Sequence, residues 1–318
     1  MKRPSQYIKA LETGLLEKQA ARALEMMANC RLCPRKCGVD RMAGETGFCG
    51  AGNRARVSDF GPHFGEESPI SGTRGSGTIF FAHCGLGCDF CQNFDISHQG
   101  RGRDVSDDEL AGMMLSLQES GCHNINFVTP SHWVPHILSA LLPAVEGGLE
   151  IPLVYNTSAY DRVKTLRLLD GIVDIYMPDF KFWDEKIAED TCGAPDYPEA
   201  ARRAISEMGR QAGDLALDGE GIAVSGLLIR HLVLPGGLAG TGKVMAFIAR
   251  EISANAYVNV MPQYRPMRER SGDGKKTARD MERPISEKEY ETALKEARAE
   301  GPLRLDPPRR VWMIQGFE

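Results

Sequence analysis

Three cysteines stand close together at positions 84, 88 and 91, with three and then two residues between them. They directly follow the apolar run 78–82, which a glycine-rich segment precedes. This pattern predicts a buried strand, so the cysteines fall on the loop that leaves its carboxyl end, where α/β folds gather their chemistry. Close cysteine spacing is typical of thiolates that bind zinc or an iron–sulfur cluster. Three thiolates leave one coordination position open, which favours a reactive metal centre over a structural one.

A second group of cysteines lies upstream and makes a complete four-thiolate set: Cys30, Cys33, Cys37 and Cys49. Two occupants fit this set. A structural zinc ion would staple a small subdomain, and a second iron–sulfur cluster would relay electrons or touch the substrate. Seven of the nine cysteines fall between Cys30 and Cys91, and no apolar signal segment follows the N-terminus. We therefore expect metal ligation and not a disulfide framework.

The composition excludes some function classes. The 318 residues carry 38 Lys and Arg against 43 Asp and Glu, giving a net charge of -5. This balance argues against a protein that binds nucleic acid through an overall excess of positive charge. No segment approaches the roughly 18 consecutive apolar residues of a membrane helix. We expect a cytoplasmic protein without nucleic-acid or membrane partners.

Short apolar strands alternate with helical stretches from about residue 75 to 265, which is the βαβ signature. Six strands are predicted, near residues 78–82, 124–128, 152–156, 173–177, 227–233 and 257–261. Six are too few for the eight-stranded barrel, so an open partial barrel or a doubly wound sheet fits the count.

Helices are predicted over residues 5–28, over 107–120 and from Ser286, the last two each opening with a capping box. Residues 311–314 are predicted to form a closing edge strand. We divide the chain into an N-terminal helix and four-Cys extension (1–70), the strand-rich domain (71–265) and a C-terminal helical tail (266–318). The segment 237–244 nearly spells a phosphate-binding loop, but Val244 lacks the hydroxyl that holds Mg²⁺, so we expect a tight turn and a helix entry there.

The loop itself resembles a known family. Phe90 precedes the last loop cysteine, Gln92-Asn93 follows it, and the whole resembles the cluster loop of the radical S-adenosylmethionine (SAM) enzymes. The similarity is to the uncharacterised branch that resembles the pyruvate formate-lyase (glycyl radical enzyme) activating enzymes. It implies a (β/α)6 partial TIM barrel in which Cys84, Cys88 and Cys91 hold a [4Fe–4S] cluster, with one iron open for SAM. It also implies that Phe90 packs near the adenine and Asn93 lies close to the methionine part of SAM.

The resemblance extends to the later loops. The family's Gly-Gly-Glu element is replaced by residues 129–132, so Thr129 and Ser131 are expected to supply the contact with the SAM amino group through backbone carbonyls or the Ser131 hydroxyl. Asp179-Phe180-Lys181 resembles the Asp-x-Lys that reaches the SAM ribose and carboxylate. Asn156 stands where the activating enzymes carry an Asp, and Arg230 matches their fifth-strand region.

The resemblance implies an oxidoreductase that cleaves SAM reductively to a 5′-deoxyadenosyl radical for hydrogen abstraction. Flavodoxin or ferredoxin is the expected reductant. The substrate is a glycine residue of a glycyl radical enzyme, or alternatively a small molecule or peptide that is modified directly. The alternative from another class is a non-catalytic zinc or iron–sulfur protein that serves as an electron carrier or scaffold.

Overall fold

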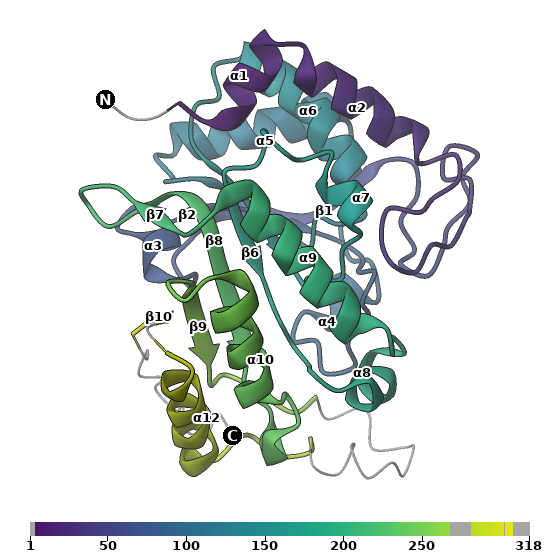
Figure 1. Cartoon of the computed structure of the whole chain (residues 1–318). Coiled ribbons are helices and arrows are strands. Elements are labelled where there is room, and N and C mark those ends of the chain that lie inside the picture. The colour runs from purple at the N-terminus through teal and green to yellow at the C-terminus, as the bar shows by residue number, and fades with distance from the viewer. Residues whose placement is uncertain (1–3, 268–280, 302, 308–318) are drawn as a thin grey trace, which may run out of the picture.

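Six parallel strands form the middle of one central sheet in the computed structural model, which describes residues 4–267, 281–301 and 303–307 (Figure 1). These strands are β2 (Ser76–Phe81), β4 (Ile125–Val128), β5 (Leu153–Thr157), β6 (Ile175–Pro178), β8 (Ala223–Leu232) and β9 (Tyr257–Met261). They lie next to one another in the order β9-β8-β6-β5-β4-β2. All six predicted strands are confirmed, because each is a mainly apolar run that a parallel sheet buries on both faces.

Four shorter or antiparallel strands complete the sheet. β1 (Ala55–His63) pairs antiparallel with β2, and β3 (Arg103–Val105) pairs antiparallel with β1 at one edge. At the other edge β10 (Arg304–Leu305) pairs parallel with β9, and β7 (Ala216–Leu217) adds to β8. Thus β1, within the segment assigned to the N-terminal extension, continues the central sheet. The predicted strand at 311–314 lies outside the described residues.

Helices connect the parallel strands and cover the outer face of the sheet (Figure 1). They include α5 (Asp107–Glu119), α6 (Val134–Glu146), α7 (Val163–Leu166), α8 (Glu185–Cys192), α9 (Tyr197–Ala212), α10 (Thr241–Phe247) and the π-helix η2 (Ile248–Ile252). The capping box at Ser106 and Glu109 is confirmed at the start of α5. A second capping box starts α12 (Glu287–Ala299) at Ser286, as predicted. The chain is therefore a mixed α/β protein with a central sheet.

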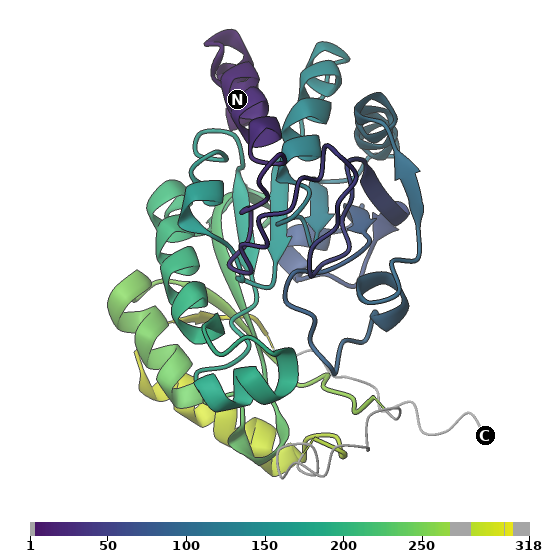
Figure 2. The same cartoon turned by 90° about the vertical axis from the view of Figure 1, so that its right-hand side faces the viewer.

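The N-terminal helix prediction is wrong in one respect. Residues 5–28 form two helices, α1 (Gln6–Glu12) and α2 (Leu15–Glu25), which both pack on α6. Gly14 separates them with a left-handed φ of 71°, a conformation that glycine adopts without steric cost. Beyond α2 the chain forms loops up to β1. This segment projects to the right of the sheet in Figure 1 and faces the viewer in Figure 2.

The short helix α3 (Ser68–Ser71) precedes β2, α4 (Phe94–Ser97) follows the loop that carries the three cysteines, and η1 (Pro235–Gly237) follows β8. Among the helices of the described ranges, none has the length and apolar character that crossing a bilayer requires.

Gly226 tests the close packing around β8. Its φ is 115°, and a Cβ there would lie 2.4 Å from the Asp214 carbonyl oxygen and 2.5 Å from the Leu215 Cα. Gly226→Ala should therefore lower the free energy of unfolding by about 2 kcal/mol in chemical denaturation. The matched control is Gly112→Ala in α5, where a Cβ meets nothing within 4 Å. It should raise stability by about 0.5 kcal/mol or more, because glycine weakens a helix interior. Equal effects of the two substitutions would contradict the close approach at β8.

Candidate functional site

The loop after β2 gathers the three predicted thiols in a largely apolar setting. Cys88 and Phe90 are buried, while Cys84 and Cys91 are half-buried. Burial raises the pKa of Cys84 to about 12, and the neighbouring Cys88 and Cys91 act in the same direction. Burial likewise raises the pKa of Cys91, which the Ser97 hydroxyl contacts at 3.2 Å between Oγ and Sγ. Without a cation in the loop these thiols are therefore held in the protonated form, and a bound metal would supply the charge that favours thiolates.

A fourth thiol lies beside this loop. The thiol of Cys192, at the end of α8, acts together with burial to raise the pKa of Cys88 well above its usual value. The loop and α8 are also joined through the backbone, where the Asp89 amide donates to the Thr191 carbonyl at 2.9 Å. Sequence spacing gave no sign of this contact, because Cys192 lies about a hundred residues beyond the loop.

Arg35 clamps the loop to the end of α8. Its guanidinium donates to four backbone carbonyl oxygens: those of Gly85 and Leu86, both at 3.0 Å, Cys192 at 2.7 Å and Gly193 at 2.6 Å. The Phe48 ring stacks on the same guanidinium, with its centroid 3.7 Å from Cζ. Arg35 belongs to the upstream cysteine segment, so this one side chain couples the two predicted metal sites.

The four upstream cysteines line a common small cavity, whose wall also includes Arg41 and His132. The backbone of this segment is held by reciprocal turns, in which the Cys30 amide donates to the Val39 carbonyl at 2.8 Å and the Gly38 amide donates to the Cys30 carbonyl at 2.9 Å. Burial raises the pKa of Cys33 to about 12, and the nearby Cys49, Cys30 and Cys37 act in the same direction on it. A Cβ on Gly85, in the downstream loop, would lie 3.3 Å from the Cys33 sulfur. The two cysteine groups are thus near neighbours.

His132 connects the same cavity to the strand that precedes the loop. Its Nε2 lies 3.1 Å from the Ala82 carbonyl oxygen, which also accepts from Trp133 Nε1 at 3.0 Å. A carbonyl oxygen only accepts, so Nε2 carries the proton. Burial lowers the pKa of His132 to about 3, so the ring is neutral. His132 stands in the loop after β4 that was expected to receive the SAM amino group.

A buried ion network fills the carboxyl ends of β5, β6 and β8, where four predicted cofactor residues meet. Arg230 donates to Asp179 at 2.7 Å and to the Asn156 Oδ1 at 2.6 Å, and Lys181 donates to Asp179 at 2.7 Å. Burial opposes ionisation of Asp179, but Arg230 and Lys181 together lower its pKa. The network reaches the cysteine loop, because the positive charge of Lys181 acts on the Cys88 thiol.

Two carboxylates that sequence reasoning missed complete this network. Glu66 and Glu67 precede α3, and their Oε2 atoms lie 3.2 and 3.9 Å from Arg230 Nη1. Burial raises the pKa of Glu67, whereas His63 and Arg230 overcome burial and lower the pKa of Glu66. Glu67 also accepts from Asn259 in β9 at 2.7 Å, so the pair ties the segment before β2 to the far side of the sheet. In the sequence, two acidic residues shortly before a proline predict an exposed turn. The tertiary structure shows that both carboxylates are buried.

The remaining predicted residues lie around these two features. Phe90 packs edge-on against Phe182, with ring centroids 5.8 Å apart. The Thr129 amide donates to the Asn156 carbonyl at 2.9 Å from a left-handed φ of 59°, and Ser131 Oγ lies 3.2 Å from Thr157 Oγ1. Asn93 is exposed and stands directly before α4.

In the described part of the chain, no three His, Cys, Asp or Glu side chains are gathered as the ligands of a single metal ion. Four thiolates on one zinc at about 2.3 Å would lie within roughly 4 Å of one another. A cubane cluster separates its thiolates further, because each binds a different iron.

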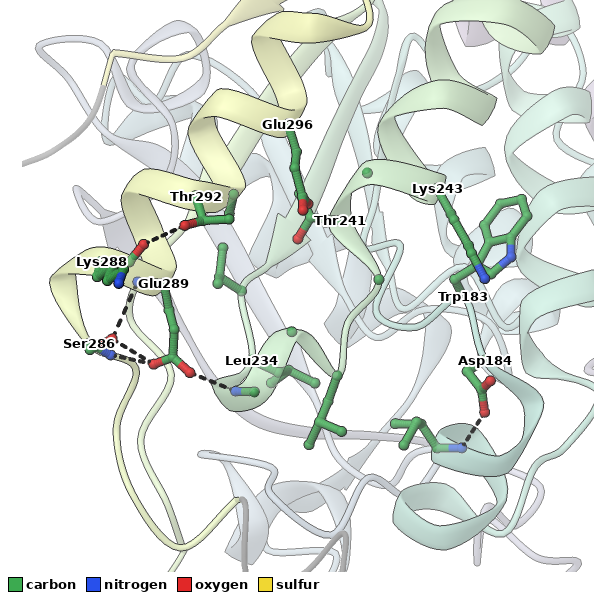
Figure 3. Close-up of a pocket in the computed structure, with 18 of the residues that line it drawn as sticks. Trp183, Asp184, Leu234, Thr241, Lys243, Ser286, Lys288, Glu289, Thr292 and Glu296 are labelled. Atoms are coloured by element: carbon green, nitrogen blue, oxygen red, sulfur yellow. Dashed lines mark hydrogen bonds between the residues drawn. The ribbon is translucent and has the colours of Figure 1, made fainter.

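A much larger cavity lies elsewhere. It has a volume of about 920 Å³ and lies between η1, α10 and α12, with Trp183 and Lys243 on one side and Glu289 on the other (Figure 3). Gly240 enters α10 with a left-handed φ of 71°, and a Cβ there would meet the Trp183 Cβ at 2.9 Å. The glycines of this segment thus serve the tight turn and helix entry that were predicted. None of the nine cysteines lines this cavity.

Removing the Arg35 clamp should loosen the loop that carries Cys84. Arg35→Leu leaves four carbonyl oxygens without their donor, so we expect less than half of the wild-type iron at the loop after anaerobic reconstitution. Arg31→Leu is the matched control, since Arg31 is exposed in the same segment. Iron content per chain is the measurement, and equal iron in wild type and Arg35→Leu would contradict the clamp.

No model of an established protein family matches the chain. A relative is described as Uncharacterized protein MJ0674 of Methanocaldococcus jannaschii. It is 32% identical over 269 residues, which cover 82% of this chain and 72% of the archaeal protein. At this identity and coverage, the chain belongs to the same family as the archaeal protein.

Proposed function

We propose that this chain is a radical SAM enzyme, with a [4Fe–4S] cluster on Cys84, Cys88 and Cys91. The observation that carries the proposal is the meeting of the cysteine loop with the Asp179–Lys181–Arg230–Asn156 network. Residues predicted from β5, from β8 and from the loop after β6 converge at one edge of the sheet, and Lys181 acts electrostatically on Cys88 in the loop after β2. A thiol loop of a purely structural metal site has no need of such a network.

The residues of the loop fit the cluster. Three thiols stand on one short loop, and the apolar surroundings that raise their pKa values also suit a centre that must be shielded from water. The positive charge of Lys181 acts to lower the pKa of Cys88, against the effect of burial, and so favours the thiolate that a cluster needs. When bound, the reduced cluster supplies the electron that cleaves SAM to methionine and a 5′-deoxyadenosyl radical, which abstracts hydrogen from the substrate.

The protein's own contribution is positioning. Arg230 fixes Asp179 and Asn156 by direct hydrogen bonds, so their side chains are held in place before SAM arrives. Lys181 is suited to the SAM carboxylate, and Asp179 to the ribose hydroxyls. Phe90, packed on Phe182, offers an apolar wall on which the adenine stacks. Thr129 and Ser131 line the same edge, at the end of β4.

The finer description of the fold belongs to this proposal. The six adjacent parallel strands are a (β/α)6 partial barrel, and residues 30–49 are a four-Cys metal-binding extension placed before it. This extension holds a second [4Fe–4S] cluster or a zinc ion. Metal analysis separates the two: about eight irons per chain indicate two clusters. Four irons with one zinc per chain indicate an enzyme with one cluster at the loop and a structural zinc ion at the four-Cys site. Zinc alone supports the non-catalytic alternative. Flavodoxin or ferredoxin is the proposed reductant, and a glycyl radical enzyme is the proposed substrate of the activating reaction.

The direct test is SAM cleavage. Anaerobically reconstituted protein with dithionite and SAM should release 5′-deoxyadenosine, and Cys84→Ala should lower the rate at least about a hundredfold, since the centre that delivers the electron is lost. Cys122→Ala is the matched control, because Cys122 is a buried thiol outside both cysteine groups, and it should keep the wild-type rate. Absence of 5′-deoxyadenosine in the iron-loaded wild type would refute the proposal.

Cys192 tests whether the loop leaves one iron open. Three thiolates suffice for the proposed centre, so Cys192→Ala should retain the loop iron and SAM cleavage, whereas Cys88→Ala should lose both. Iron content and 5′-deoxyadenosine yield are the two readouts. If Cys192→Ala loses iron as fully as Cys88→Ala does, Cys192 is a fourth ligand and the site is closed to SAM.

A further inference from the structure

Arg41 is a buried cation that has no anionic partner among the residues that the structure describes. Its side chain is among the largest fully buried ones, at 1% exposure. Nε donates to the Gly52 carbonyl at 2.8 Å and Nη1 donates to the His132 carbonyl at 2.7 Å. The Trp133 ring lies 5.1 Å from Cζ. Within the ranges that the structure describes, Arg41 pairs with no carboxylate, and its Nη2 has no hydrogen-bond partner.

Such an arrangement is costly unless something compensates the charge. A guanidinium that leaves water loses its hydration, and two carbonyl dipoles do not replace a counter-ion. Lys181 and Arg230, the buried cations of the ion network, each have a carboxylate at 2.7 Å. Arg41 differs from both, so its counter-ion must come from another kind of group.

The four-Cys cavity is where that group belongs. Arg41 lines the cavity together with Cys30, Cys33, Cys37 and Cys49. The Gly52 carbonyl that accepts from Arg41 Nε stands three residues beyond Cys49, so the guanidinium lies at that end of the cysteine segment. A second unpartnered atom lies in the same cavity. His132 lines it at 2% exposure, and its Nδ1 has no partner among the described residues. Because Nε2 carries the ring proton, Nδ1 presents a lone pair, which suits a cavity that holds a metal ion.

We propose that Arg41 is the counter-ion of a doubly negative metal–thiolate centre held by Cys30, Cys33, Cys37 and Cys49. This rests on the proposed metal centre of the N-terminal extension. Four thiolates leave a net double negative charge around either Zn²⁺ or a [4Fe–4S]²⁺ core. The unpartnered Nη2 is then a donor to a ligand sulfur, and a charge-assisted N–H···S contact replaces the missing ion pair.

Arg41 is therefore a positioning residue for this centre, and its effect should depend on whether metal is bound. In the metal-loaded protein the guanidinium is paired. In the metal-free protein it is an unpaired buried charge, which opposes the stability gained from its two carbonyl contacts. A merely structural arginine would stabilise both states alike.

The test uses the full chain with Cys84, Cys88 and Cys91 replaced by Ala, so that all bound metal belongs to the four-Cys site. Arg41→Leu, Arg41→Lys and Arg31→Leu are compared in this background for the rate of metal loss to a chelator and for thermal unfolding with and without metal. Arg31 is the matched control, because it is exposed and sits next to Cys30. If the triple variant does not fold, the same substitutions are made in the single variant Cys84→Ala. The metal that this variant still binds is then assigned to the four-Cys site.

Arg41→Leu should lose metal at least about tenfold faster, Arg41→Lys should stay within about threefold of its parent, and Arg31→Leu should be unchanged. If the centre is a cluster, Arg41→Leu should also lower its reduction potential by about 59 mV or more, the equivalent of a tenfold change for one electron. Unfolding temperatures should fall for the metal-loaded Arg41→Leu protein and change little for the metal-free protein.

Equal metal loss in Arg41→Leu and its parent, or equal destabilisation with and without metal, would overturn the proposal. A parent that binds no metal would overturn the four-Cys centre itself, and SAM cleavage by the wild type would still stand or fall separately.

Discussion

The Arg230 guanidinium is the contact on which the candidate site depends. From β8 it reaches Asp179 after β6, Asn156 at the end of β5, and Glu66 in the segment before β2. These groups come from parts of the chain up to 164 residues apart. Because the network is buried, each charge needs its partners, and removing one would leave the others without compensation. The same constraint fixes the edge of the sheet where the cysteine loop lies.

The upstream cysteine segment is built into this arrangement. Arg35 binds four carbonyl oxygens of the loop and of the end of α8, while His132 joins the four-Cys cavity to the carbonyl of Ala82, two residues before Cys84. Such contacts make the loop geometry depend on the segment around Cys33 and Cys37. A metal centre that orders this segment therefore also orders the loop, through direct contacts and over a short distance.

Much of the fold could be predicted from the sequence, since it is written in local patterns. Buried parallel strands are continuous apolar runs, and the two capping boxes mark helix starts through side chains only three residues apart. The break at Gly14 was missed because the apolar period continues across it. β1 was missed because half of its residues are polar or exposed, as an antiparallel strand near the edge allows.

The site was predictable only where the ligands are close in sequence. Cys84, Cys88 and Cys91 have a spacing that indicates their chemistry, and so do the four upstream cysteines. Glu66, Glu67, Arg35, Arg41 and Cys192 carry no such signal, because their roles arise from tertiary contacts with residues far along the chain. A buried charge looks like a surface charge until the fold reveals its partners.

The central claim is that the loop after β2 holds an iron cluster with one iron left free of protein ligands. A crystal of the anaerobically reconstituted protein, measured on both sides of the iron absorption edge, tests it directly. The account predicts an anomalous iron peak bounded by the sulfurs of Cys84, Cys88 and Cys91, with no protein atom bound to the remaining iron. Absence of iron at this loop, or a fourth protein ligand on the cluster, would contradict it.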